Sequence, residues 1–192
     1  MSIDTGLLTA IGEVLPDPVP AMPETVACAP CGKGSYARII TTGTSVEFAH
    51  KGIMHVLSAG TYIYAGSAYG PGGIGARLRR HFQREKKLHW HVDRLTSVAE
   101  SIQALAIEQG SECEIVARLG NLPGVRHPVA GFGSSDCRIC CSHLLQYCSY
   151  PGCRRCVNPC LAHIGTGSVG AQRHHSESGR LRQPSPVGYR QV

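Results

Sequence analysis

The chain lacks any apolar run that approaches the roughly 20 residues needed to cross a bilayer. Its N-terminus also lacks a basic segment followed by a long apolar stretch, the pattern of a secretory signal. We therefore expect no membrane segment and a cytoplasmic location. In a reducing compartment the ten cysteines are expected to be thiols or metal ligands rather than disulfides.

Acidic residues are also scarce, because 13 Asp and Glu stand against 19 Lys and Arg, which gives a formal net charge of +6. Much of the excess lies between Arg77 and Arg94, and a solvated helix face is the simplest alternative explanation. A polyanionic partner is favoured. We expect DNA, with RNA as an open alternative, and the predicted contact residues are Arg79, Arg80, Arg84, Lys86, Lys87 and His89.

The length of 192 residues fits one ordinary domain with additional ends. Residues 1–32 are rich in proline and have little periodicity, so they are predicted to be an irregular leader. Residues 33–147 carry the regular patterns of a folded domain. Residues 148–192 are predicted to be a Cys-rich segment followed, from about Thr166, by a disordered tail.

The folded region is predicted to be α+β, with a small antiparallel sheet of about three strands flanked by about three helices. β-branched runs indicate strands at Tyr36–Thr42, Ile53–Leu57 and Thr61–Ala65. The glycine turn at 71–73 precedes a helix of about 14 residues with an apolar stripe. Apolar spacing from Val92 onward indicates a second helix that Gly110 ends. A capping-box pattern, in which Glu114 follows Ser111, starts a third.

Short motifs in this region resemble a known superfamily. Tyr64-Ala-Gly66, followed by Arg77 and His81, resembles the second half of the GIY-YIG nuclease signature, and Gly34-Ser35-Tyr36 best matches its first half. Further short runs place the resemblance in the DUF123 branch, over about residues 33–147. These runs are Gly-Pro-Gly-Gly at 70–73, His-Trp-His-Val-Asp at 89–93, Glu-Cys at 112–113, Gly-Phe-Gly-Ser-Ser-Asp-Cys at 131–137 and Ser-His-Leu at 142–144.

Two departures from the signature stand out. The motif centres are Ser35 and Ala65 where isoleucine is usual, and altered packing rather than lost chemistry is expected from this. The spacing between Tyr36 and Tyr64 is also long, so an extra strand around 53–57 is predicted to fill it.

The resemblance implies a GIY-YIG-like fold and a metal-dependent endonuclease site. It assigns water activation to Tyr36 and Tyr64 and a metal-binding role, for Mg²⁺ or Mn²⁺, to Glu112, with Asp136 as a second candidate. Arg77 offers a planar fork for phosphate oxygens. His81, one helical turn on, is predicted to share a proton with Tyr64 or to bind phosphate.

The segment after that helix adds further candidates. His89 and His91 are predicted to contact phosphate or to assist proton transfer, with His91 placed in the catalytic set. Trp90 is predicted to pack in the core rather than to stack on a base.

Cysteine pairs with zinc-knuckle spacing occur at Cys137–Cys140 and Cys153–Cys156. The set Cys153, Cys156, Cys160 and His163 is predicted as the zinc ligands, whereas Cys137 is interpreted as structural because it lies inside a family-like run. A structural Zn²⁺ is the less favoured cofactor beside Mg²⁺. The lone pair Cys28–Cys31 is weak evidence for a metal site.

The sequence thus favours a metal-dependent endonuclease that hydrolyses DNA, in repair or restriction. Two alternatives stay open. One is a nucleic-acid-binding module that has kept the basic helix but lost catalysis, and the other is a zinc-stabilised interaction protein.

Overall fold

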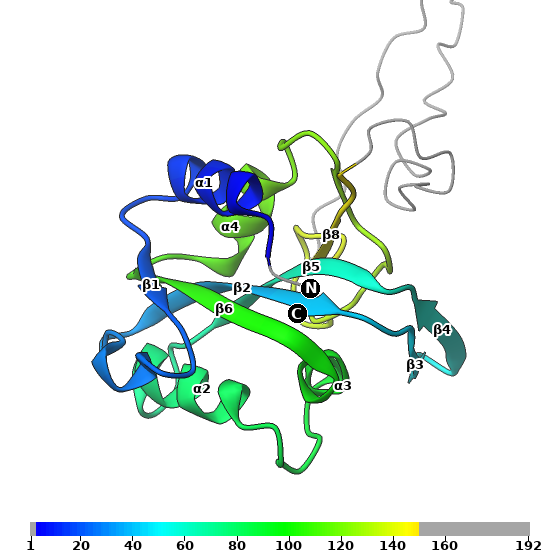
Figure 1. Ribbon diagram of the computed structural model, residues 1–192, viewed down its shortest axis with the longest axis horizontal. Coiled ribbons are helices and arrows are strands. Elements are labelled where there is room, and N and C mark those ends of the chain that lie inside the picture. Colours follow the sequence, from blue (N-terminus) through cyan, green and yellow to red (C-terminus); the bar gives the residue numbers. More distant parts are fainter. Residues whose placement is uncertain (1–2, 150–192) are drawn as a thin grey trace, which may run out of the picture.

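The computed structural model describes residues 3–149 (Figure 1). Among these residues no helix has the length and apolar character needed to cross a membrane. The elements in chain order are α1 (Thr5–Val14), β1 (Val19–Ala21), the 3₁₀ turn η1 (Val26–Cys28), β2 (Gly34–Thr42), β3 (Val46–His50), β4 (Ile53–Leu57), β5 (Gly60–Ser67), α2 (Gly73–Phe82), α3 (His91–Ser97), β6 (Ala99–Glu108), α4 (Glu112–Leu119), β7 (Val125–Arg126) and β8 (Leu144–Tyr147).

The fold is α+β, as predicted, but the sheet is larger than expected. In the described part of the chain, six strands pair in the order β1-β6-β2-β5-β8-β7, and every pairing is antiparallel. Figure 1 shows α1 and α4 on one face of this sheet and α2 and α3 on the other. The four helices therefore cover both faces of the central strands.

The central strand β2 is buried along its whole length because it lies between β5 and β6 and under helices on both faces. Ala37 and Ile39 point into the core beneath α1 and α4. Tyr36, Arg38 and Ile40 alternate with them and point to the α2 and α3 face. This alternation brings two polar side chains of the strand to the face where the functional candidates lie.

The second predicted helix is wrong beyond Ser97, because α3 ends there and β6 begins at Ala99. The alanines and Leu105 of this segment favour a helix by intrinsic propensity. In the sheet, however, its backbone pairs with β1 and β2 on both sides. Both faces of the strand are covered, so apolar residues do not alternate with polar ones and the strand pattern is hidden.

The predicted irregular leader, residues 1–32, contains regular structure over its described part. Asp4 caps α1 by accepting hydrogen bonds from the amides of Gly6 and Leu7. Leu7 and Ile11 are buried in the core beneath the sheet. Proline stops α1 at Leu15 but does not stop β1 from adding to the edge of the sheet. The division of the chain into domains stays a prediction.

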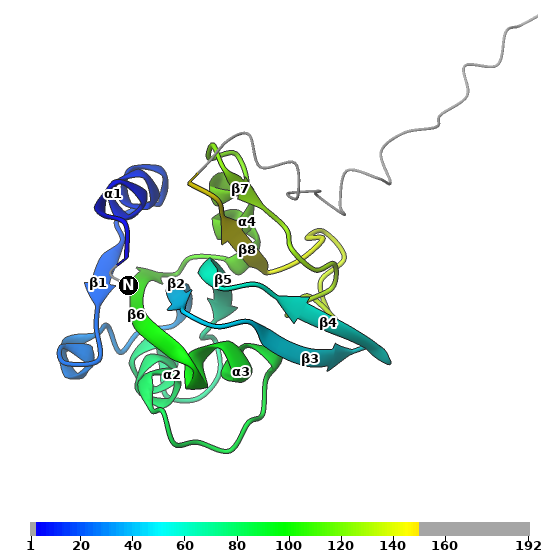
Figure 2. The same cartoon turned by 45° about the vertical axis from the view of Figure 1, so that its right-hand side comes forward.

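The predicted strand at 53–57 is confirmed as β4, but it does not enter the main sheet. It pairs with β3 as a separate two-stranded hairpin, which Figure 2 shows beside the sheet. Phe48 and Leu57 are the buried side of this hairpin, and they join it to α3 and β5 through a shared apolar cluster. The hairpin fills the long spacing between β2 and β5.

The remaining helices follow the sequence more closely. The helix α2 has the predicted stripe of Ile74 and Leu78, both buried, although at 10 residues it is shorter than expected. Ser111 caps α4 through the amide of Cys113. Glu114 does not complete the predicted capping box but accepts hydrogen bonds from Arg118, at 2.7 and 2.9 Å.

Burial of α1 makes a test of the N-terminal segment straightforward. Ile11→Ala removes a side chain with 0% exposure and is expected to lower the free energy of unfolding by about 2–5 kcal/mol through cavity formation. Glu13→Ala, on the exposed side of the same helix, is the control. Urea denaturation of both variants measures the effect, and equal stability for the two would show that α1 does not belong to the core.

Candidate functional site

A pocket of about 540 Å³ opens on the α2 and α3 face of the sheet, at the end near β8. Its size is that of an ordinary ligand site. Residues from seven separate segments line it: β2, β3, β5, α2, the start of α3 with the residues just before it, the start of α4 and the loop before β8. Its polar and titratable lining includes every residue of the predicted catalytic and Mg²⁺ sets: Tyr36, Tyr64, Arg77, His81, His91 and Glu112.

The two tyrosines come from neighbouring strands. Tyr36 on β2 pairs with Gly66 on β5, and Tyr64 pairs with Arg38, so both rings project from the same face. A side chain at Gly66 would collide with the Tyr36 ring, and one at Gly133 would lie 2.7 Å from the Tyr64 ring. The two glycines thus leave room for the two rings.

A hydrogen bond joins Tyr36 to His81. The Tyr36 hydroxyl and His81 Nε2 are 3.0 Å apart, and His81 Nδ1 lies 3.5 Å from Asp93 Oδ1. The sequence predicted that His81 shares a proton with Tyr64 or binds phosphate, and these roles stay predictions; the tyrosine that contacts His81 in the structure is Tyr36 on β2. With Nδ1–H facing the carboxylate, Nε2 carries the lone pair that accepts from the phenol.

Electrostatics keep this pair neutral. Burial, and then the positive charge of Arg38, lower the pKa of His81 to about 3, against the opposing pull of Asp93. Burial also raises the pKa of Tyr36, although Arg38 and Arg77 oppose it. At neutral pH the imidazole and the phenol are therefore both uncharged. The pKa of Tyr64 is likewise raised, mainly by burial.

Asp93 is fully buried and anchors this arrangement. Its carboxylate accepts hydrogen bonds from Arg80 at 3.1 and 3.3 Å and from the backbone amides of His89 and Trp90 at 2.9 and 3.1 Å. Burial alone would raise the pKa of Asp93, but the contacts with His81, Arg80 and the two amides lower it well below its ordinary value. Asp93 therefore stays ionised, and sequence reasoning missed it.

Arg77 faces the pocket without a carboxylate partner among residues 3–149. Its guanidinium carbon lies 4.9 Å from the centre of the Trp90 ring, and its Nε is buried with no hydrogen-bond partner in the described structure. Trp90 also stacks with Arg80, at 4.2 Å. Trp90 thus packs against two arginines, and Arg77 keeps donors available for an anion.

Arg38 is a second residue that sequence reasoning missed. It is fully buried, and its three guanidinium nitrogens have no hydrogen-bond partner within residues 3–149. The guanidinium lies between the two catalytic candidates, 5.8 Å from the Tyr36 ring centre and 5.3 Å from that of Tyr64. The available signal was its position inside the predicted strand Tyr36–Thr42.

The predicted nucleic-acid contacts divide into two groups. Arg80 and Lys86 make contacts within the protein. Arg80 binds Asp93, and Lys86 donates hydrogen bonds to the backbone carbonyls of His81 and Gln83 at 2.7 and 2.8 Å. Burial lowers the pKa of Lys86 to about 8. The exposed members are Arg79, Arg84, Lys87 and His89, of which His89 lines the pocket.

His91 belongs to an aromatic group at the pocket rim. Its ring lies 4.9 Å from that of His50 on β3 and 5.7 Å from that of Phe132. Burial and the neighbouring His91 lower the pKa of His50. His50 was not predicted, since the long spacing between the tyrosines hid the hairpin that delivers it.

Two carboxylates reach the pocket from the side opposite α2. Glu112 is half-buried at the start of α4, and Asp136 is exposed in the loop before β8. Within residues 3–149 they do not gather with a third acidic or imidazole ligand. A hard divalent cation such as Mg²⁺ is compatible with so few protein donors, because water and substrate oxygens complete its coordination.

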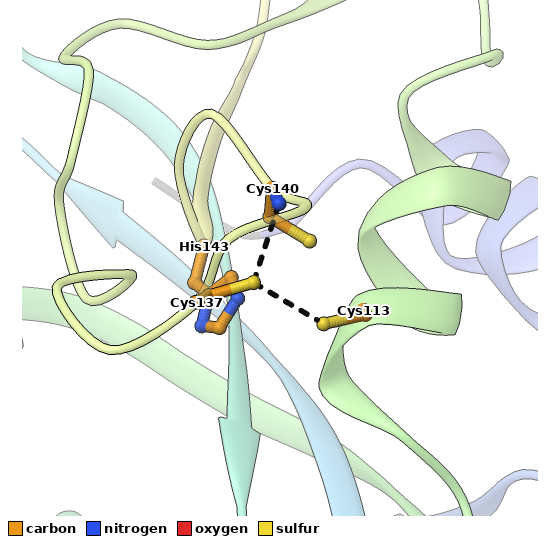
Figure 3. A group of neighbouring side chains, drawn as sticks. All are labelled: Cys113, Cys137, Cys140 and His143. Atoms are coloured by element: carbon orange, nitrogen blue, oxygen red, sulfur yellow. Dashed lines mark hydrogen bonds between the residues drawn. The ribbon is translucent and has the colours of Figure 1, made fainter. Parts of the chain in front are cut away.

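Next in sequence to these two carboxylates are members of a cluster of three cysteines and one histidine that could hold a metal ion (Figure 3). Its members are Cys113, Cys137, Cys140 and His143, and their ligand atoms lie within 4.8 Å of one another. Thiolate and imidazole ligands favour Zn²⁺ over Mg²⁺. The sequence identified the Cys137–Cys140 spacing but not the partners Cys113 and His143.

The ligand set predicted for zinc lies outside the described residues; it consists of Cys153, Cys156, Cys160 and His163. The signal for the observed partners was present in the family-like runs Glu112-Cys113 and Ser142-His143. In the cluster, hydrogen bonds from the amides of Cys140 and Ile139 lower the pKa of Cys137 to about 6. Burial raises the pKa of Cys113 and of Cys140.

Comparison with known proteins identifies one family. The family named Domain of unknown function DUF123 matches residues 35–166. No curated protein and no solved structure shows significant similarity to the chain. The match includes the whole pocket and the Cys/His cluster.

The low pKa of His81 gives a test in pH. Between about pH 6.5 and pH 3 the unfolded chain binds a proton at this position and the folded protein does not, so lowering the pH favours unfolding. His81→Gln, which does not titrate, is expected to reduce the loss of unfolding free energy by about 1.4 kcal/mol per pH unit in this window. Urea denaturation of wild type and variant at about pH 7, 6 and 5 measures the difference. Parallel curves would contradict a neutral, buried His81.

Proposed function

The chain belongs to the DUF123 family, and from the side chains gathered in its pocket we propose that it is a metal-dependent endonuclease that hydrolyses DNA, in repair or restriction. The observation that best supports this proposal is that two phenols, a guanidinium, an imidazole and a carboxylate from separate segments line one pocket. We further propose that the family is a branch of the GIY-YIG superfamily, since the motif residues of the resemblance are the ones that line this pocket.

The proposed activation of water uses the contact between Tyr36 and His81. Because the pKa of Tyr36 is raised, a preformed phenolate is disfavoured and the phenol acts as a relay. The water transfers a proton to the phenol oxygen as the phenol transfers its own proton to His81 Nε2, 3.0 Å away. Asp93 then faces the imidazolium at Nδ1. Tyr64 shares the pocket and orients the water or the phosphate.

Stabilisation of charge on the phosphate falls to Arg77. Its guanidinium lines the pocket, and its position against the Trp90 ring fixes the plane of the fork. Donors held in place before the reaction stabilise developing negative charge without reorganisation. A phosphate bound at Arg77 would also offset part of the positive charge of Arg38, which contributes to the low pKa of His81, so substrate binding favours the proton transfer.

Glu112 would hold the divalent cation, and Asp136, which lines the same pocket, is the second candidate carboxylate. When bound, Mg²⁺ or Mn²⁺ supplies positive charge at the phosphate oxygens and at the leaving group. The exposed residues Arg79, Arg84 and Lys87 are proposed to contact the DNA backbone outside the pocket. RNA has the same backbone charge and is the alternative substrate.

The alternative with the closest support is a binding module without catalysis, because the exposed basic residues need no chemistry to bind a polyanion. The Cys/His cluster is compatible with bound zinc both in the proposed nuclease and in a zinc-stabilised interaction protein. Only cleavage separates these functions, since the proposed nuclease shares both features.

A nicking assay on supercoiled plasmid tests the proposal. With Mg²⁺ the wild-type protein is expected to nick the plasmid, and EDTA is expected to stop it. Arg77→Ala is expected to lower the rate about 10²–10³-fold, as loss of one preorganised donor does, and Glu112→Ala is expected to abolish Mg²⁺-dependent nicking while DNA binding is largely kept.

The matched control is Arg118→Ala on α4, whose side chain pairs with Glu114 on the surface, outside the pocket. It removes the same charge and is expected to nick at the wild-type rate. Normal cutting by both Arg77→Ala and Glu112→Ala would refute the site. Salt-sensitive DNA binding without cleavage under any divalent cation would select the binding module.

The tyrosine relay has its own test. Tyr36→Phe keeps the buried ring but removes the hydroxyl that contacts His81, and the nicking rate is expected to fall by at least about 10²-fold. Tyr69→Phe is the matched control, because that ring is 50% exposed and lies outside the pocket lining. Single-turnover rates at saturating protein separate the chemical step from binding. Equal rates for the two variants would exclude the relay.

A further inference from the structure

We propose that Cys113, Cys137, Cys140 and His143 bind one structural Zn²⁺, which ties the start of α4 to the loop before β8. The ligand atoms lie within 4.8 Å of one another. Zinc bonds of about 2.0–2.3 Å in a tetrahedron separate neighbouring ligand atoms by about 3.3–3.8 Å. Cys113 Sγ and Cys137 Sγ, at 3.5 Å, already fall in that range.

The loop has the backbone geometry of a zinc knuckle. The amides of Ile139 and Cys140 both point at Cys137 Sγ, at 3.4 and 3.2 Å, as Figure 3 shows for Cys140. Amide donors stabilise negative charge on a sulfur. A coordinated thiolate is such a charge, whereas a buried neutral thiol would gain less from two donors.

The fourth ligand comes from the residue just before β8. His143 is buried, with 4% exposure, and its Nε2 has no hydrogen-bond partner in the described structure. A buried ring nitrogen without a protein partner is costly unless another group satisfies the imidazole. None of the three cysteines is in a disulfide. Three sulfurs and one imidazole are a ligand set for structural zinc rather than for a hard cation.

The cluster joins segments that the sheet does not hold together. Cys113 is in the first turn of α4, Cys137 and Cys140 are in the loop, and His143 precedes β8. Glu112 and Asp136, the two carboxylates at the pocket, are each next to a ligand in sequence. The zinc would thus fix the spacing between these two carboxylates. The importance of that spacing for catalysis rests on the proposed nuclease function, but zinc binding itself does not.

Metal analysis of the full chain, purified under reducing conditions without chelator, tests the site. About one Zn²⁺ per chain is expected. Cys137→Ala with Cys140→Ala is expected to lose it. Cys28→Ala with Cys31→Ala is the matched control, because that pair has the same spacing but is exposed and lies outside the cluster, and it is expected to keep the metal. The pair Cys153→Ala with Cys156→Ala is also expected to keep it.

A second pair of variants guards against a simple failure to fold. His143→Cys supplies a new thiolate and is expected to retain zinc, whereas His143→Ala is expected to bind it at least about tenfold more weakly. Cobalt substitution of the wild-type protein gives an independent readout, since Co²⁺ bound by thiolates shows sulfur-to-metal charge-transfer absorption. Removal of zinc from the wild type is expected to lower its melting temperature.

Three results would overturn the proposal. One is absence of zinc from a folded wild-type chain that also gives no thiolate–cobalt absorption. Another is zinc that survives in the Cys137 and Cys140 variant but is lost from the Cys153 and Cys156 variant. The third is a Cys113–Cys137 disulfide that persists in reductant. Zinc binding with no nicking would leave the site standing and refute the nuclease.

Discussion

The buried carboxylate of Asp93 is the interaction on which the proposed site depends. It joins α2 to the segment before α3, because it accepts hydrogen bonds from Arg80 and from two backbone amides. It also faces His81, which in turn contacts Tyr36 on the central strand. A buried charge without partners is strongly destabilising, so the folded protein has to keep the partners of Asp93 in place. The same requirement fixes the orientation of the His81 imidazole.

The same face of the sheet carries three guanidinium groups, those of Arg38, Arg77 and Arg80, near one buried carboxylate, that of Asp93. Arg38 lies under the two tyrosines, and Arg77 lines the pocket above them. The single carboxylate of Asp93 is already bound to Arg80. An anion that enters the pocket therefore meets the guanidinium of Arg77, while the buried charge of Arg38 lies behind the two tyrosine rings. Positive charge of this kind favours an anion over a neutral ligand, which is the electrostatic support for the proposed function.

The sequence identified several residues that line the pocket, but it did not predict much of the fold that brings them together. Tyr36, Tyr64, Arg77 and Glu112 were recognisable because each lies in a short local motif. The strand β6 was not, because its apolar residues on both faces repeat no strand pattern and its alanines favour a helix. Asp93, Arg38 and Cys113 were missed for a different reason, since each acquires its role from partners distant in sequence. Such partners are fixed only by the topology of the sheet.

The two sides of the pocket are held by different means. On the α2 side, backbone pairing in β2 and β5 and the contacts of Asp93 position the tyrosines and the imidazole. On the other side, Glu112 starts a helix and Asp136 lies in a loop that has no sheet pairing over residues 131–141. A loop without such pairing is among the first parts of a fold to open. A cross-link between Cys113 and the loop opposes that opening. Because Cys113 follows Glu112 and Cys137 follows Asp136 in sequence, such a cross-link would act directly on the two segments that carry the pocket carboxylates.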